Sequence, residues 1–375
     1  MRIVHILKGK ANPDTLNGVN RVVHWMATSQ SRLGHDVEVW GLAESITPPP
    51  HPREYHLRLF PATWPRVTLT PAMKAALTTL EPGTWVHFHS VFILEYPAIA
   101  RLLRKRGFAY GVTPHGGYAP GVFKNNSWRK RIYVALREAN YLRNAAWIQA
   151  IGVSEIKNIL CLAPRARAVL IVNCQHFIPA HAVALPSNVE RPLFGYCGRL
   201  ATQHKGLDYL LAGFAAYKAR GGVGELWLIG DGEDRASLER QAAESGAAAQ
   251  VRFLGVRHGE EKLDLVASLD AFIHSSRWEG IPMACLEAAA LGVPLLVSRE
   301  TNLARYVEQS GAGLVLDETS AVGVERALGR VEQLYDNNQL EQMGENARLL
   351  IEKEFRWEEN AKAFVAAIRA AIPVV

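Results

Sequence analysis

The feature that most restricts the fold is a regular alternation of short apolar runs and amphipathic segments, separated by loops that contain glycine. The first apolar run, 2–7, is followed by Gly9 and a polar loop, and the next segment, 19–33, has helical spacing. A second apolar run, 36–40, comes soon after it. A strand, a glycine-containing loop, a helix and another strand in this order are typical of a βαβ unit, whose strands are parallel. We therefore expect a mostly parallel sheet in the first half of the chain.

The alternation continues through the rest of the chain. Further strands of the first half are expected at 85–89, 109–113, 147–151 and 169–172, with helices near 95–106 and 128–143. In the second half, strands are expected at 193–196, 226–229, 251–254, 271–274 and 294–297, with helices at 207–219, 235–245, 260–267 and 283–291. The last segment, 357–372, is predicted to be an amphipathic helix. The predicted fold class is α/β, with two doubly wound domains in tandem.

The length of the chain also indicates two domains, because 375 residues are about twice what one hydrophobic core usually organises. The stretch 178–192 contains three prolines and separates the two series of expected strands. We predict a first Rossmann-like domain at 1–185, a second at 186–355, and a C-terminal helix within 356–375.

The composition excludes several classes of protein. Hydrophobic residues make up 49% and charged residues 21% of the chain, which is typical of a globular protein and not of a disordered one. The apolar stretch 284–297 is interrupted by Glu287 and Gly292 and is shorter than the roughly 18–20 residues that cross a bilayer. The N-terminus is charged too early for a signal peptide. The cysteines have no paired spacing, which argues against a zinc ribbon and favours a cytoplasmic location: Cys161, Cys174, Cys197 and Cys285.

The two halves of the chain carry net charges of opposite sign. Residues 1–185 contain 22 Lys and Arg against 9 Asp and Glu, whereas residues 186–375 contain 20 against 27. A basic half suits nucleic acid, an anionic membrane surface or a phosphorylated substrate, and net charge alone does not choose among them. An incidental bias of solvated charges is the remaining interpretation.

One loop of the second half precedes the helix expected at 283–291 and is a candidate ligand site. In open α/β sheets, ligands bind beyond the carboxyl ends of the strands, where such loops lie. The backbone N–H groups of Gly280, Ile281 and Met283 come just before the helix, whose N-terminus favours an anion such as a phosphate. Pro282 has no N–H and suits the first helical turn. We predict that this segment binds a phosphate-containing ligand.

Charged side chains in and near two loops of the second half are further candidates for ligand binding. Glu279 ends the loop, and Glu287 lies within the helix, where burial is costly unless a partner such as ligand hydroxyls is present. A capping glutamate followed by a solvated glutamate is the simpler alternative. Arg199 and Lys205 flank the loop after the first strand of the second domain, and their charges suit a diphosphate leaving group. Ordinary surface cations are the alternative for these two residues.

The loops of the first half offer fewer charged groups. Gly18 lies in the first strand-to-helix loop, where glycine allows the backbone to approach a ligand closely. His115 follows a strand and is a candidate for contact with substrate. The alternative is that its ring makes its hydrogen bonds within a turn and has no role in binding. His87 and His89 share one face of their strand and raise the possibility of a metal site. No carboxylate or cysteine at ligand spacing accompanies them, so we expect no metal.

Taken together, these motifs resemble glycosyltransferase family 4. The signature is a pair of glutamates eight positions apart, Glu279-Gly-x-Pro-x-x-x-x-Glu287-Ala, followed by Gly-x-Pro at 292–294. Segments in family order and spacing lie at 198–200, 205–211, 228–232, 253–255 and 311–315. The resemblance covers nearly all of 193–320. In the first half, 113–121 is similar to a segment of family members that build bacterial polysaccharides.

The resemblance implies a GT-B fold, in which two Rossmann-like domains face each other across a cleft and a C-terminal helix returns to the first domain. It implies a nucleoside diphosphate sugar as donor and a glycan or lipid-linked sugar as acceptor, with no metal, cofactor or nucleic acid. Glu287 would hold the ribose hydroxyls, Glu279 would face the transferred sugar, and His115 would lie near the anomeric carbon. The chain departs from the family pattern at Asn17, where a glycine is frequent, and at Cys174, which follows Asn173 in place of glycine.

The reaction implied is transfer with retention of configuration. No Asp or Glu of the first domain is an evident nucleophile opposite the donor, so we expect substitution on one face of the sugar. The leaving diphosphate would accept the proton of the acceptor and would be stabilised by Arg199, Lys205 and the N–H groups of 280–283. A non-catalytic sugar-nucleotide sensor, an epimerase and a phosphorylase are the alternatives. A nicotinamide-dependent dehydrogenase is disfavoured because the first loop lacks Gly-x-Gly-x-x-Gly.

The basic first domain is expected to bind the acceptor. Two expected helices carry clusters of cations that could dock on anionic lipid at the inner face of a membrane. A soluble sugar acceptor is the alternative. The two clusters are Arg101, Arg104, Lys105 and Arg106, and Arg129, Lys130 and Arg131.

Overall fold

The computed structural model describes residues 1–15, 17–62, 68–119, 128, 132–175 and 189–372. The chain divides into two compact units. Unit 1 comprises Met1–Asn173 together with Trp357–Val375, and unit 2 comprises Cys174–Arg356. The domain boundary predicted at 185 and 186 lies outside the described residues.

In the described part of unit 1, seven parallel strands form a sheet with the order β3-β2-β1-β4-β5-β6-β7. The neighbouring strands β4, β5 and β6 are buried along their whole length, as expected for a parallel sheet with helices on both faces. The strands are β1 (Arg2–Lys8), β2 (Asp36–Ala43), β3 (His56–Pro61), β4 (Trp85–His89), β5 (Tyr110–Thr113), β6 (Trp147–Ala150) and β7 (Ala168–Leu170).

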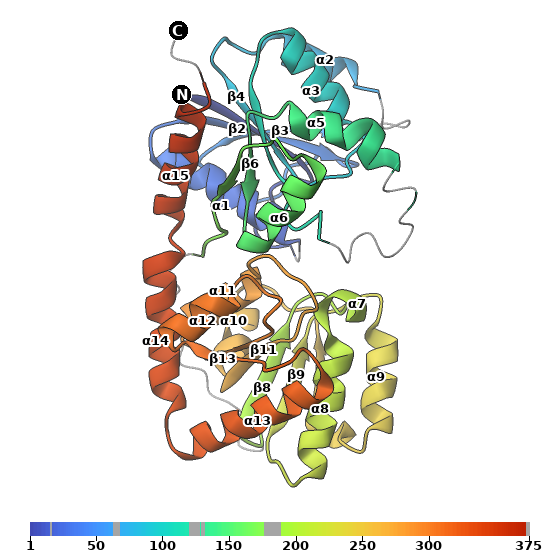
Figure 1. Cartoon of the computed structure of the whole chain (residues 1–375), viewed down its shortest axis with the longest axis vertical. Helices are drawn as coiled ribbons and strands as arrows, with labels where there is room; N and C mark the ends of the chain where they lie inside the picture. Colours follow the sequence, from blue (N-terminus) through green and yellow to red (C-terminus); the bar gives the residue numbers. More distant parts are fainter. Residues whose placement is uncertain (16, 63–67, 120–127, 129–131, 176–188, 373–375) are drawn as a thin grey trace. The chain divides into compact units, whose positions relative to one another are not determined.

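Helices cover both faces of this sheet. On one face, the main core joins strand residues such as Phe88 and Val112 to α2, α3, α5 and α6. On the other face, α1 and α15 lie side by side although the sequence separates them widely (Figure 1). Phe364 of α15 contacts the rings of His5 and His87 there. The helices are α1 (Gly18–Arg32), α2 (Pro71–Thr78), α3 (Tyr96–Lys105), a π-helix (Val134–Glu138), α5 (Ala139–Arg143), α6 (Val153–Leu162) and α15 (Trp357–Arg369).

In the described part of unit 2, six parallel strands form a second sheet, with the order β10-β9-β8-β11-β12-β13. Phe194 and Tyr196, two residues apart on β8, belong to the core that faces α8, α9 and α13. The residue between them, Gly195, therefore faces the opposite side, as the alternation of a strand requires. The strands are β8 (Leu193–Cys197), β9 (Glu225–Ile229), β10 (Val251–Gly255), β11 (Ala271–His274), β12 (Leu295–Val297) and β13 (Gly313–Val315).

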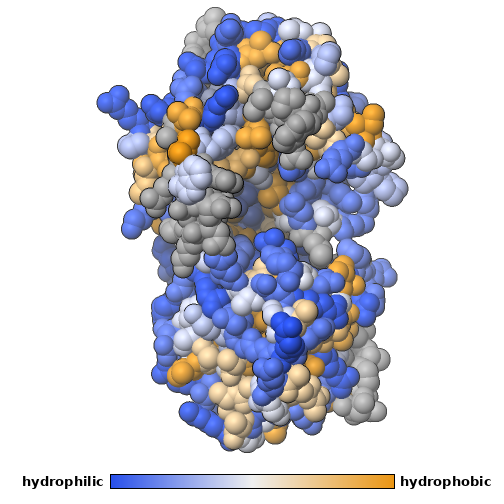
Figure 2. All heavy atoms as spheres, turned by 90° about the vertical axis from the view of Figure 1, so that its right-hand side faces the viewer, coloured by the Kyte–Doolittle hydropathy of each residue, from blue (hydrophilic) through white to orange (hydrophobic). Residues whose placement is uncertain are grey.

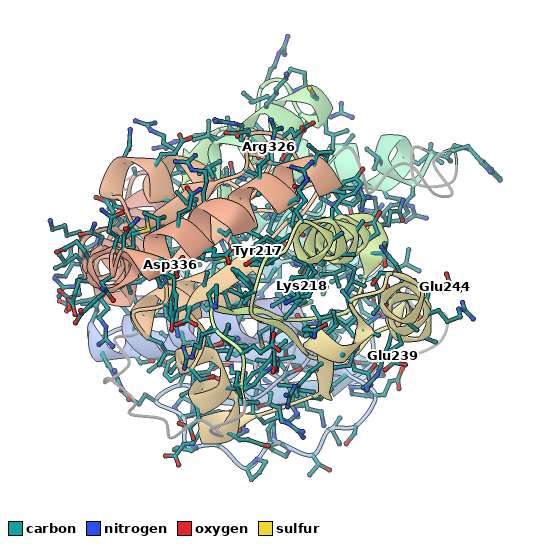
Figure 3. The ribbon with its side chains drawn as sticks, turned by 90° about the horizontal axis from the view of Figure 1, so that it is seen from below. Tyr217, Lys218, Glu239, Glu244, Arg326 and Asp336 are labelled. Carbon is teal, nitrogen blue, oxygen red and sulfur yellow. The ribbon has the colours of Figure 1, made fainter. Side chains whose placement is uncertain are left out.

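The longer helices of unit 2 pack in two groups, α8 with α9 and α13, and α14 with α11 and α12. Figure 3 shows α8 and α13 side by side, with Tyr217 and Lys218 on α8. The Tyr217 hydroxyl donates to the carbonyl of Val223 at 2.7 Å and so fixes the turn that leads into β9. The helices are α7 (Thr202–Lys205), α8 (Leu207–Ala219), α9 (Arg235–Glu244), a 3-10 helix (Ala248–Gln250), α10 (Gly259–Ala267), α11 (Met283–Ala290), α12 (Ala304–Ser310), α13 (Ala321–Asp336) and α14 (Leu340–Glu354).

The predicted fold class is confirmed, with two parallel-sheet Rossmann-like domains and with the expected strands overlapping observed ones. The pattern did not predict β3 or β13. β3 lies at the edge of its sheet and is buried fully only at Phe60, so its sequence carries little strand signal. The expected helix at 128–143 contains a π-helical turn at 134–138, and residues 129–131 within it lie outside the described part.

Candidate functional site

Two loops of unit 2, which follow the neighbouring strands β8 and β11, are held together by hydrogen bonds. The backbone N–H of Arg277 donates to the carbonyl of His204 at 2.9 Å. The Arg277 guanidinium donates to both oxygens of the Asp208 carboxylate, at 2.9 and 2.6 Å. The Ser275 hydroxyl donates to the carbonyl of Gly206 at 3.1 Å. These bonds place the segment that contains Lys205 against the start of the loop that contains Glu279.

Glu279 is the centre of a cluster of ionisable side chains at this edge of the sheet. Lys205 Nζ donates to Glu279 Oε2, and the same oxygen lies 3.4 Å from His274 Nε2 and 3.5 Å from His204 Nε2. The side chains of Lys205 and Glu279 are only 16% and 18% exposed, so solvent and salt screen their charges weakly. Two residues predicted from the sequence are therefore in direct contact.

The sequence analysis did not identify the two histidines of this cluster. His204 immediately precedes Lys205, and His274 is the last residue of the strand that was expected at 271–274. A search for polar residues at the carboxyl ends of all predicted strands would have found His274, because a polar side chain is unusual in a buried parallel strand. His204 carried no such signal.

Opposing effects set the ionisation of the cluster. Burial by itself would raise the pKa of Glu279, but the charge of Lys205 and the two histidines together lower it well below its usual value. Burial lowers the pKa of His204 to about 4 and also lowers the pKa of His274. At neutral pH the cluster is therefore a carboxylate paired with an ammonium, beside two neutral imidazoles.

Further contacts fix the loop that follows Glu279. The Asn302 amide donates to the carbonyl of Glu279 at 3.0 Å, and the Asn302 N–H donates to the carbonyl of Gly280 at 3.1 Å. Ile281 and Met283 are buried. Pro282 is the N-cap of α11 and supplies no side-chain hydrogen bond to the helix, since proline has no polar side chain. The first turn of α11 thus starts from a rigid loop with no side-chain cap.

Glu287 lies inside α11 and is 4% exposed. We expected ligand hydroxyls to offset the cost of burying this carboxylate. The structure also gives it a partner within the protein, because Lys262 Nζ of α10 donates to Glu287 Oε1 at 2.6 Å. The Lys262 side chain is itself only 15% exposed. Sequence reasoning did not predict Lys262, which has no motif around it.

Arg199 and Gly18 are two further residues that the sequence predicted to contact the donor. Arg199 is 59% exposed, and its guanidinium lies 4.0 Å from the carboxylate of Glu233. The structure therefore does not bring it into the Lys205–Glu279 cluster. Gly18 is the first residue of α1, and Asn17 caps this helix by accepting a hydrogen bond from the N–H of Val19 at 3.0 Å. The residue that departs from the family pattern thus has a structural role as N-cap.

His115 of unit 1 follows β5 and adopts a left-handed backbone conformation, with φ of 53°. Non-glycine residues with positive φ are uncommon, and they gather where a site constrains the backbone. Among the described residues of unit 1, the others are Ala11 after β1 and Ser90 and Phe92 after β4. Since β1, β4 and β5 are neighbours in the sheet, backbone strain is concentrated at the carboxyl edge of its three central strands. This edge is where a ligand of an α/β unit is expected.

The described residues contain neither a candidate metal cluster nor a candidate membrane-spanning helix. Within them, no group of three or more histidine, cysteine, aspartate or glutamate side chains has an arrangement that could hold a metal ion. Likewise, no helix in the described ranges combines the length and the apolar character that crossing a bilayer requires.

Comparison with known proteins places these features in a family. The model described as "Glycosyl transferase 4-like domain" matches residues 17–175, and the model described as "Glycosyl transferases group 1" matches residues 178–350. The chain belongs to the family 4 type of glycosyltransferases. The chain is 33% identical over 115 residues to the lipopolysaccharide core biosynthesis glycosyltransferase LpsE of Rhizobium meliloti, a match that covers 31% of the chain and 32% of LpsE. The chain thus spans about a third of the length of the first curated relatives it matches.

Solved structures agree with the glycosyltransferase fold over the full length. Sucrose-phosphate synthase from Thermosynechococcus elongatus matches with a TM-score of 0.78 and 19% identity, covering 99% of both chains. HepE of Anabaena, solved with UDP and glucose, matches with a TM-score of 0.73 and 14% identity, covering 99% of this chain and 100% of HepE. At these identities the likeness establishes the GT-B type of fold.

Proposed function

We propose that this protein transfers a sugar from a nucleoside diphosphate sugar to a glycan or lipid-linked sugar acceptor, with retention of configuration, in the synthesis of a polysaccharide or cell-surface glycan. The observation that carries the proposal is the partly buried Lys205–Glu279 pair at the carboxyl edge of the unit 2 sheet, next to the first turn of α11. Family membership and the UDP and glucose bound by HepE support the same reaction class.

Each group of unit 2 has a role in this proposal. The N–H groups at 280–283 and the ammonium of Lys205 stabilise the negative charge that develops on the leaving diphosphate. Glu279 orients Lys205 and faces the transferred sugar. Glu287 accepts hydrogen bonds from the ribose hydroxyls, while Lys262 balances its charge. Arg199 is exposed and acts as a mobile cation for the diphosphate.

Retention is supported by the state of Glu138 and Glu155, two of the three buried glutamates in the described part of unit 1. Glu138 accepts from the N–H of Phe92 at 2.6 Å and from the Tyr118 hydroxyl at 2.7 Å. Glu155 accepts from the N–H groups of Gly116 and Ile151, at 2.5 and 2.8 Å. Carboxylates committed to such bonds are poor nucleophiles, which favours substitution on one face of the sugar, with the leaving diphosphate taking the acceptor's proton. The single-face reaction requires no metal or cofactor.

The donor site is tested by thermal denaturation with UDP, GDP, ADP and TDP and their common sugar conjugates. A ligand that binds only the folded state raises the melting temperature. We expect a rise with one nucleotide family in the wild-type protein, and a much smaller rise in Glu287→Gln and Glu287→Ala. Glu325→Ala is the matched control, because Glu325 is another buried glutamate of unit 2 in an ion pair, with Arg220 at 2.7 Å. Equal ligand effects in the Glu287 variants and the control would contradict the assignment of Glu287.

A measurement of turnover distinguishes an enzyme from a sugar-nucleotide sensor. With the nucleotide identified, donor consumption is followed by mass spectrometry in Lys205→Ala and Arg199→Ala, together with the configuration of the product by NMR. We expect turnover to fall about 10²–10³-fold when a group that stabilises the developing charge is removed. Unchanged turnover in both variants would contradict the diphosphate roles, and an inverted product would exclude the single-face reaction. Donor binding without any turnover in the wild-type protein would favour the sensor.

Binding of unit 1 to an anionic membrane surface is part of the proposal. Trp128, Ile132 and Leu136 are spaced by four residues and are 62%, 49% and 72% exposed. Figure 2 shows that hydrophobic side chains form patches on an otherwise largely hydrophilic face of the molecule. Exposed apolar side chains beside cations are typical of helices that lie in a membrane interface. Arg101, Arg104, Lys105 and Arg106 are within the described residues, whereas Arg129, Lys130 and Arg131 lie outside them.

Co-flotation with liposomes tests this surface. We expect binding to vesicles of phosphatidylglycerol and phosphatidylcholine at low salt, weaker binding at high salt, and little binding to pure phosphatidylcholine. Trp128→Ser with Leu136→Ser should reduce binding, whereas the control Val322→Ser, at an exposed apolar residue of unit 2, should not. Absence of binding to the anionic vesicles at low salt would favour a soluble acceptor.

A further inference from the structure

A line of buried hydrogen bonds crosses unit 1 from α1 to His115. Gln30 Oε1 lies 2.7 Å from His5 Nε2, and His5 Nδ1 lies 2.8 Å from His89 Nε2. His89 Nδ1 in turn lies 3.0 Å from His115 Nε2. Gln30, His5 and His89 are at most 1% exposed, whereas His115 keeps intermediate exposure. The line therefore ends at His115, which is the only one of its four residues that is partly exposed.

The secondary structure explains why these rings meet. In the register between β1 and β4, His5 lies opposite His87, and His89 follows two residues later on the same face. The turn after β5, where His115 has φ of 53°, brings the His115 ring to within 5.3 Å of the His89 ring centre. Phe364 of α15 packs on His5 and excludes water from this side. The sequence separates these elements, so the line exists only in the folded unit.

The direction of the hydrogen bonds along the line is fixed by its first member. Burial lowers the pKa of His5 to about 4 and that of His115 to about 3, and lowers the pKa of His89 well below its usual value, so all three rings are neutral at physiological pH. A neutral imidazole has one donor and one acceptor nitrogen, so three in a row have only two arrangements, with every proton pointing one way or the other. In the structure the Gln30 amide presents Oε1 to His5 Nε2, and this oxygen can only accept, while Gln30 Nε2 is buried without a hydrogen-bond partner among the described residues. Every N–H therefore points towards Gln30, and the proton of His115 is on Nε2.

A second, separate line of hydrogen bonds lies beside the first. His87 Nε2 lies 2.7 Å from Thr113 Oγ1, which donates to Gln149 Oε1 at 2.7 Å. Gln149 Nε2 donates to the carbonyl of Ile171 at 2.7 Å. This second line also joins a histidine to a glutamine within the same sheet, but no hydrogen bond among the described residues joins it to His115.

We propose that Gln30, His5 and His89 are positioning residues that hold His115 in the tautomer with its proton on Nε2, so that His115 Nδ1 accepts a hydrogen bond from a hydroxyl of the sugar substrate. The proposal rests on the function proposed above, and on the expectation from the sequence that His115 lies near the anomeric carbon of the transferred sugar. A fixed acceptor costs no reorganisation when the substrate binds, which is the advantage of a preorganised polar group. In the same way, the partner of the second nitrogen sets which nitrogen of a histidine is available to a ligand.

Nuclear magnetic resonance of protein labelled with ¹⁵N histidine tests the tautomer directly. The chemical shifts of the two ring nitrogens distinguish the protonated from the bare nitrogen, and the His115→Gln spectrum assigns the signals. We expect the wild-type protein to show His115 protonated on Nε2. Gln30→Met removes the acceptor with little change of volume, and should convert a measurable part of His115 to the tautomer with the proton on Nδ1. Gln149→Met makes the same change in the second line and should leave His115 unchanged.

Two results would overturn the proposal: a wild-type His115 protonated on Nδ1, or a His115 tautomer that is the same in Gln30→Met as in the wild-type protein. The first is measured on the wild-type chain and is independent of how the variants fold. Activity gives a second readout, since Gln30→Met should lower kcat roughly tenfold without weakening nucleotide binding to unit 2. Failure of the proposed function is distinguishable, because it appears as absent nucleotide binding or turnover in the wild-type protein while the tautomer stays as expected.

Discussion

At the scale of single residues, the charge of Glu279 depends on its neighbours more than on its burial. Burial alone would keep this carboxyl protonated to a higher pH, yet Lys205, His274 and His204 stabilise its ionised form. The same neighbours are held in place by the hydrogen bonds between the loops after β8 and β11. Ionisation at this position is therefore a consequence of tertiary structure.

Glu279→Gln should lower the stability of unit 2 in a pH-dependent way. The folded-state pKa of Glu279 is depressed, so its contribution to stability is complete above its unfolded pKa, about 4.5, and is lost as the pH falls towards the folded value. We expect the variant to be less stable by about 1–3 kcal/mol at pH 7, because Lys205 loses a charged partner. Thermal melts from pH 7 to pH 3.5 should show the difference shrinking. A difference that does not change with pH would show that the Glu279 charge is not stabilising.

We expect Glu279→Gln to reduce turnover strongly while lowering the melting temperature only slightly. The amide keeps the shape of the side chain but removes the charge that orients Lys205. If the charge matters in the transition state, kcat falls by about 10²-fold or more while the melting temperature changes by a few degrees. Equal kcat in the variant and the wild-type protein would assign Glu279 a purely structural role.

At the scale of elements, Gly206 sets the position of Lys205. It ends α7 and begins α8 with φ of 63°, and a Cβ at this position would clash with the backbone carbonyl of Ser275. A side chain here is unfavourable both for the backbone conformation and for the contact between the two loops. The close approach of the loops therefore requires glycine.

Gly206→Ala is expected to destabilise unit 2 by about 2–4 kcal/mol and to weaken nucleotide binding, because the loop that carries Lys205 must move. Gly246→Ala is the matched control: Gly246 also has positive φ, 78°, but open space surrounds its Cβ position. The control should cost only about 1–2 kcal/mol and leave nucleotide binding unchanged. Denaturant unfolding and nucleotide titration measure the two effects. Equal costs for the two variants would contradict a close contact at Gly206.

The N-cap of α1 gives a second prediction for an element. Asn17 accepts from the N–H of Val19, so Asn17→Ala should lower stability by about 1 kcal/mol, and Asn17→Gly by only a few tenths of a kcal/mol. Denaturant unfolding followed by circular dichroism measures these differences. A larger cost for glycine than for alanine would show that Asn17 does not act as a cap.

At the scale of the whole molecule, the last helix completes the first unit. α15 belongs to unit 1 although unit 2 intervenes in the sequence. Its Phe364 packs on His5, His87 and Trp147, with ring centres 4.7 to 5.8 Å apart. The sheet face that holds the histidines is therefore covered by a segment from the opposite end of the chain.

Phe364→Ala should destabilise unit 1 by about 3–5 kcal/mol, because it leaves a cavity against three buried rings. Phe364→Leu, which keeps most of the apolar volume, should cost clearly less. Limited proteolysis with mass spectrometry reports on each unit separately. We expect Phe364→Ala to be cleaved faster within 1–173 while 189–356 stays resistant. Uniform cleavage of both units would show that the effect of Phe364 is not confined to unit 1.

The features that depend on local pattern could be predicted from the order of the residues alone. Apolar runs and helical spacing predicted most strands and helices, because each element must bury one face or both. The two glutamates eight positions apart and Lys205 were also found in this way, since loops that follow strands carry the chemistry of α/β domains. The edge strand β3 was missed because it buries too little apolar surface to produce such a pattern.

Which groups act together depends on how the elements pack. Lys262 meets Glu287, His274 and His204 meet Glu279, and Gln30 is joined to His115 through two other histidines. Apart from His274, which ends a buried strand, none of these partners is marked by local sequence, because each comes from a different element. A hydrogen bond or ion pair depends on distances of a few ångströms between side chains, and these distances are fixed by strand order, register and helix packing. The chain's pattern thus determines where polar groups emerge, and packing determines their partners and their protonation.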